Sequence, residues 1–133
     1  MSVAFESDLG VFTPEGLEFT GSDDAVATMQ QIMALAAPLN ASRVTGGGGN
    51  ADSGPWGSAG VPFGAPFTTN FDYFQFHHSY ADMMTHVPLG PYDDAAAAWA
   101  IATYGIASLD GLLPRKPAPP PDSQYTPRSS RKR

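Results

Sequence analysis

All three histidines of the chain lie in one short segment, YFQFHHSYADMMTH, which covers residues 73–86. It contains His77, His78 and His86, and Asp82 follows His78 by four positions. Imidazole nitrogens and carboxylate oxygens are ordinary zinc ligands, and histidine can also act as a general base near neutral pH. Thiolate ligands and disulfides are excluded because the chain has no cysteine. The segment is a candidate metal or catalytic site. The competing interpretation is that these are surface or packing residues.

Asp8 is a second candidate ligand because it follows a predicted strand. The short apolar run at residues 3–6 favours a strand, and the stretch AGVPFGAPFT at residues 59–68 favours another, interrupted by proline. The histidine segment follows this second strand. In sheets covered by helices, ligands gather at the carboxyl ends of strands, so Asp8 and a histidine could share a zinc ion there. The alternative for Asp8 is a turn-forming role.

Two helices are predicted to cover the sheet. The first lies within residues 20–40, starts with Ser22 as its cap and has a buried stripe of Val26, Met29, Met33 and Ala37, with Pro38 and Asn40 closing it. The second runs from about Pro91 to Leu113 with an apolar stripe of Trp99, Ala102, Ile106, Leu109 and Leu113. A short strand is expected at residues 42–45 and a flexible glycine loop at 46–50. The order of elements predicts an α/β fold.

Charge divides the chain into two parts. Residues 1–114 hold twelve of the thirteen acidic residues and one of the seven basic residues, a net charge of −11. Residues 115–133 carry +5 and are rich in proline and serine, which favours a disordered basic tail. An acidic body argues against nucleic-acid binding by the domain. The tail could bind anionic surfaces or a partner, act as a targeting signal, or have no function. We expect neither a signal peptide nor a membrane span in this chain.

Several segments in the same order resemble one family. FHHSYADMMT resembles the C-terminal histidine segment of plasma glutamate carboxypeptidase and its relatives, which are di-zinc aminopeptidases and carboxypeptidases. ESDLGVFTPEGLEFTGS, PLN, Asp52 with Trp56, AGVP and the final helix AAAAWAIATYGIASLDGLLPR also match that family's pattern. The similarity covers about residues 3–115. It implies that residues 1–114 are the C-terminal part of a zinc-peptidase catalytic domain, in which helices pack on a mixed sheet.

The resemblance assigns roles to four residues. It implies that Asp8 and His78 are ligands of the same zinc ion. His77 and Asp82 match the pattern without being direct ligands in the family, and Asp82 could orient His78 or cap the turn after the histidines. His86 lies outside the motif and is expected at the surface.

The resemblance also implies what this chain lacks. Two zinc ions activate a bridging water in the complete family site, and a glutamate serves as general base. The family supplies the remaining ligands and this base from upstream of the ESD segment, so no catalytic residue is assigned here. We expect a fragment with half of a two-zinc site, weak zinc binding and no peptidase activity alone, as from a truncated gene product.

Three functions remain open at this point. The first is a zinc-dependent exopeptidase of carboxypeptidase or dipeptidase type acting on short peptides. The second is a non-catalytic remnant or pseudoenzyme, and the third is an interaction protein that works through its basic tail. The resemblance implies a secreted or lysosomal location and leaves a homodimer open.

Overall fold

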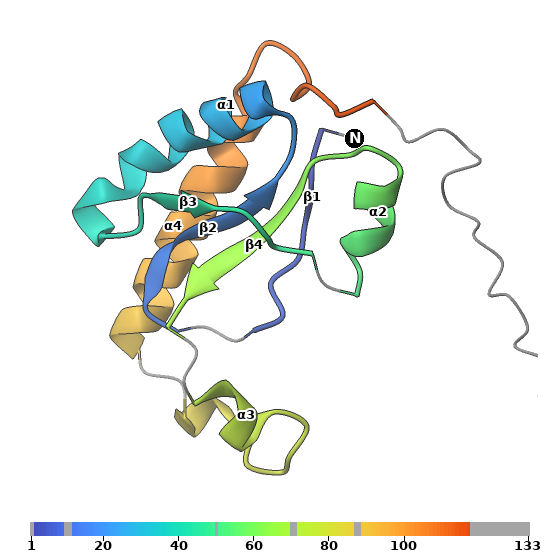
Figure 1. The fold of residues 1–133 in the computed structure, drawn as a ribbon. Coiled ribbons are helices and arrows are strands. Elements are labelled where there is room, and N and C mark those ends of the chain that lie inside the picture. Colours follow the sequence, from blue (N-terminus) through green and yellow to red (C-terminus); the bar gives the residue numbers. More distant parts are fainter. Residues whose placement is uncertain (1, 10–11, 50, 70–71, 87–88, 118–133) are drawn as a thin grey trace, which may run out of the picture.

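The fold is built on a four-stranded mixed sheet (Figure 1). The computed structural model describes residues 2–9, 12–49, 51–69, 72–86 and 89–117. The strands are β1 (Ala4–Phe5), β2 (Pro14–Thr20), β3 (Arg43–Thr45) and β4 (Phe63–Thr68), in the spatial order β1-β4-β2-β3. β4 is parallel to β1 and antiparallel to β2, while β3 is parallel to β2. The mixed sheet with helices on it confirms the α/β prediction.

The longest strand, β2, was missing from the sequence-based layout. Leu17 and Phe19 alternate with Glu18 and Thr20, the period-two pattern of a strand with one buried face. Leu17 is 1% exposed and Phe19 is 2% exposed, and both point into the main core. That alternation was the signal that could have identified the strand.

Pro66 lies inside β4 and does not interrupt it. The parallel strand β1 pairs with β4 only at Phe63 and Gly64. The carbonyls of Pro62 and Gly64 face β1, where they accept hydrogen bonds from Ala4 and Glu6. By alternation Pro66 faces the same side, beyond the end of β1, so its missing N–H interrupts no ladder bond.

Two helices cover the face of the sheet that carries Leu17 and Phe19 (Figure 1). They are α1 (Asp23–Met33), which continues as a tighter 3-10 turn over Ala34–Leu39, and α4 (Leu89–Ala107). Short helical segments complete the fold: α2 (Gly54–Ser58), α3 (Tyr73–Phe76) and a 3-10 turn at Met84–His86. None of the helices in the described ranges combines the length and apolar character that crossing a membrane requires.

The first helix begins as predicted and ends differently. The Ser22 hydroxyl accepts a hydrogen bond from the Ala25 N–H at 3.2 Å and caps the helix. Met29 and Met33 are buried as expected. The 3-10 winding changes the angular step per residue, so Ala36 is buried and Ala37 is exposed, contrary to the predicted stripe.

The last helix is shorter at its C-terminus than predicted. It starts at Leu89 and ends at Ala107, so Leu109 and Leu113 lie beyond it. Leu109 is exposed, whereas Leu113 returns to the core at 2% exposure. The Leu113 N–H donates a hydrogen bond to the Ser2 hydroxyl at 3.0 Å, which holds the segment after α4 against the N-terminus.

The glycine run after β3 lies against the sheet on the face away from the helices. The Thr20 hydroxyl donates to the Gly47 carbonyl at 2.9 Å, and the Glu18 carboxylate accepts from the Gly48 N–H at 3.1 Å. Gly48 is buried. The expectation of a loose loop is therefore wrong for Gly47 and Gly48, whereas Asn50 lies outside the described residues. Most of the predicted tail, residues 118–133, also lies outside them.

Candidate functional site

Asp8 follows β1 by three residues and is exposed. The segment before it is held on two sides. The Glu6 N–H donates to the Gly64 carbonyl at 3.1 Å, and the Glu6 carboxylate accepts from the backbone N–H groups of Asp52 and Ser53 at 3.0 and 2.8 Å. Hydrogen bonds to a charged carboxylate are stronger than those to a neutral group, so these contacts hold the chain at Glu6, two residues before Asp8.

The histidine segment leaves the sheet after β4. Because β1 and β4 are parallel, the chain leaves both strands at the same end of the sheet, where Figure 1 shows the loop after β1 and helix α3. This is the strand-end arrangement that the sequence predicted for Asp8 and the histidines.

Three rings stack at the end of α3. The Tyr73 and His77 ring centroids are 4.7 Å apart, and those of His77 and His78 are 3.8 Å apart, both pairs at an interplanar angle of 29°. The backbone N–H of His77 donates a hydrogen bond to the Tyr73 carbonyl at 2.9 Å, and the helix ends there. His77 therefore packs between Tyr73 and His78, and both histidines are exposed.

His78 has a left-handed backbone, with φ at 55°. Histidine is more frequent there than most non-glycine residues, yet the conformation costs about 1–3 kcal/mol where the surroundings impose it. Such residues cluster at functional sites. Neighbouring hydrogen bonds hold the turn, including one from the Ser79 hydroxyl to the Phe76 carbonyl at 2.7 Å.

Electrostatics connect Asp8 to this ring stack. Desolvation raises the pKa of the Tyr73 hydroxyl above its usual value, and the negative charges of Asp8 and Asp82 raise it further. The Tyr73 ring in turn stacks on the His77 ring.

The other two polar residues of the segment have different surroundings. The Asp82 N–H donates to the Ser79 carbonyl at 3.2 Å, so its backbone belongs to the turn after the histidines. Its proposed orientation of His78 stays a prediction. His86 is exposed, as expected, and its ring stacks on Phe76 with centroids 4.7 Å apart.

Within the described ranges, no three side chains of the histidine, cysteine, aspartate and glutamate types come together in a way that could hold a metal ion. A two-residue donor set leaves most of a four-coordinate zinc shell to water or to other ligands. The described residues thus offer at most part of a metal site.

Comparisons with known proteins show what the chain is similar to. No family model matches the chain. It is 42% identical over 114 residues to carboxypeptidase Q from Bos taurus and from Homo sapiens, and 36% identical over 115 residues to that from Xenopus laevis. The chain is related to carboxypeptidase Q. The matches cover 86% of this chain, which agrees with the extent of the resemblance to plasma glutamate carboxypeptidase relatives.

The chain spans about a quarter of the length of these carboxypeptidase Q relatives, 24% in each case. The solved structure of a peptidase M28 precursor from Shewanella amazonensis SB2B resembles the fold with a TM-score of 0.70. That likeness has 26% sequence identity and covers 89% of this chain and 26% of the other. Both the sequence and the fold of this chain are therefore similar to those of proteins named as peptidases.

Three features of the site were missed by sequence reasoning. The sequence analysis gave Glu6 no role, although its carboxylate accepts two backbone hydrogen bonds just before Asp8. The left-handed conformation of His78 was not predicted, because the enrichment of histidine in that region is too weak to identify a single position. The adjacency of Tyr73 and His77 was detectable in principle, since residues four apart lie on one helical face.

Proposed function

We propose that this chain is the C-terminal part of the catalytic domain of a zinc-dependent exopeptidase that acts on short peptides. The observation that carries the proposal is the 42% identity to carboxypeptidase Q over 114 residues, together with the strand-end position of Asp8 and the histidine turn. A carboxypeptidase or dipeptidase activity is the form of the reaction that this similarity supports best.

Asp8 and His78 are the residues we propose as ligands of one zinc ion. Both side chains are exposed, so a cation can reach them, and carboxylate oxygen with imidazole nitrogen is an ordinary zinc donor set. When bound, zinc supplies Lewis-acid polarisation of the scissile carbonyl and lowers the pKa of a coordinated water. His77, packed against His78, and Asp82 in the same turn are proposed to orient the ligand.

The chain is not expected to hydrolyse peptides alone. No glutamate of this sequence is assigned as general base, and the described residues provide no third ligand at the site. The second zinc and the base are proposed to come from outside this sequence. We further propose that the protein is secreted or lysosomal and that its substrates are short peptides. Whether it forms a homodimer is left open.

The zinc content of the purified chain tests the ligand assignment. After equilibrium dialysis against zinc, His78→Ala is expected to retain less metal than the unmodified chain, because an imidazole donor is lost. His86→Ala is the matched control, since His86 lies in the same segment and stacks on Phe76. Equal zinc content in the two variants would remove the proposed role of His78.

A peptidase assay on the same samples tests the second half of the proposal. Hydrolysis of a panel of dipeptides by the zinc-loaded chain is expected to stay at the level of buffer with zinc. Hydrolysis that exceeds this level and disappears in His78→Ala would contradict an incomplete site.

A non-catalytic remnant is the second candidate function. The observation in its favour is that the described residues do not assemble three metal donors. Unchanged zinc content in both Asp8→Asn and His78→Ala would favour this candidate.

A further inference from the structure

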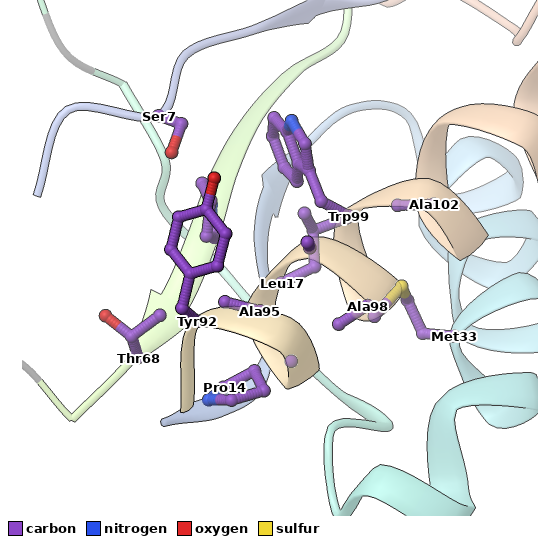
Figure 2. Close-up of a pocket in the computed structure, with 13 residues that line it drawn as sticks. Ser7, Pro14, Leu17, Met33, Thr68, Tyr92, Ala95, Ala98, Trp99 and Ala102 are labelled. Carbon is purple, nitrogen blue, oxygen red and sulfur yellow. The ribbon is translucent and has the colours of Figure 1, made fainter. Parts of the chain in front are cut away.

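A pocket of about 190 Å³ lies between helix α4 and the sheet, and nothing in the proposed metal chemistry uses it. Figure 2 shows Leu17, Ala98, Trp99 and Met33 around its apolar part. Leu17, Met33 and Ala98 belong to the buried core, and Trp99 is held against Phe5 with ring centroids 5.0 Å apart. The inner wall is therefore fixed by packing.

The pocket also has a polar rim. Three hydroxyl groups form this rim: Ser7 from the segment after β1, Thr68 from β4 and Tyr92 from α4. Figure 2 shows the Tyr92 hydroxyl and the Ser7 side chain on the same side of the pocket. Tyr92 is 41% exposed, so this rim faces solvent.

Size and lining together define the ligand. Apolar cavities of roughly 150 Å³ stay dry and bind benzene-sized molecules. An apolar wall with a few placed polar groups is the usual composition of a small-molecule site, in which the polar groups set the orientation. A pocket of this volume holds one aromatic ring, and its rim can hydrogen-bond one hydroxyl on that ring.

We propose that this pocket binds a free, single-ring phenolic molecule, with the ring against Leu17 and Trp99 and the hydroxyl at Tyr92 and Ser7. The site needs no metal ion and lies at the same end of the sheet as Asp8. The rim distinguishes phenols from plain aromatic hydrocarbons, because a rim hydroxyl can form a hydrogen bond only with a ligand that carries a polar group.

Titration of the full chain with p-cresol and with toluene tests this proposal by NMR. The indole N–H resonance of Trp99 is expected to shift on addition of p-cresol, whereas that of Trp56, which does not line the pocket, stays in place. Tyr92→Phe is expected to weaken p-cresol about three- to tenfold and to leave toluene unchanged, because only p-cresol loses a hydrogen bond.

Filling the pocket gives the matched comparison. Ala95 lines the pocket and is half-buried, whereas Ala97 on the same helix is exposed. Ala95→Leu is expected to abolish the Trp99 shift, and Ala97→Leu to preserve it. Equal p-cresol affinity in these two variants, or equal loss of p-cresol and toluene in Tyr92→Phe, would overturn the proposal. If Ala95→Leu does not fold, as judged by circular dichroism, the Tyr92→Phe comparison decides.

Discussion

Phe19→Ala is expected to lower the free energy of unfolding by about 3–5 kcal/mol. Phe19 is the largest of the fully buried side chains among the described residues, at 2% exposure, and lies in β2 under both covering helices. Removing the ring loses its burial and leaves a cavity that the packed neighbours fill only in part. Domains of this size have a total stability of about 5–15 kcal/mol, so the loss is a large fraction.

Urea unfolding followed by circular dichroism measures this effect. Phe74→Ala is the matched control, because Phe74 is the same residue type at 80% exposure in α3. Its unfolding free energy is expected to stay within about 0.5 kcal/mol of the unmodified chain. Similar losses in the two variants would mean that β2 is not the centre of the core.

Gly48→Ala is expected to destabilise the chain by about 1–3 kcal/mol. Gly48 has φ at +83°, a region that disfavours a side chain. A Cβ at this position would lie 2.7 Å from each of three backbone atoms, in Glu18, Gly64 and Ala65. Backbone atoms of two paired strands cannot move aside without breaking the ladder.

Gly46→Ala is the control for this substitution, since Gly46 lies in the same run and a Cβ there meets nothing within 4 Å. It is expected to leave stability unchanged or to raise it by up to about 1 kcal/mol, through a less flexible unfolded chain. Thermal unfolding of the two variants gives the comparison. Equal midpoints would contradict a glycine run packed on the sheet.

Short sequence patterns correctly predicted the features that depend only on neighbouring residues along the chain. The cap at Ser22 and the buried Met29 and Met33 follow from helical spacing and first-turn chemistry, and the structure contains them. The glycine run was misjudged because composition reports conformational freedom, whereas the contacts of Gly48 with two strands depend on tertiary packing. Leu113 is buried as predicted but does not lie in the helix, because the chain turns back to the core after α4 ends.

For the candidate site too, some features could be predicted from local sequence patterns and others could not. The positions of Asp8 and the histidines after two strands were readable once strands were recognised, and the parallel pairing of β1 with β4 agrees with them. The strand β2 between β4 and β3 was overlooked, although Leu17 and Phe19 alternate correctly. The φ of 55° at His78 and the two backbone hydrogen bonds to Glu6 arise from tertiary contacts, which no short pattern encodes.

The measurement that tests the central claim most directly is a double-mutant cycle on zinc affinity. Zinc dissociation constants are obtained by competition titration for the unmodified chain, Asp8→Asn, His78→Ala and the double variant, with folding checked by circular dichroism. If both residues bind one ion, each single substitution weakens zinc binding. The loss of binding free energy in the double variant is then smaller than the sum of the two single losses, by a coupling energy of about 0.5–3 kcal/mol. Strictly additive effects, or affinities equal to that of the unmodified chain, would contradict a shared zinc ion.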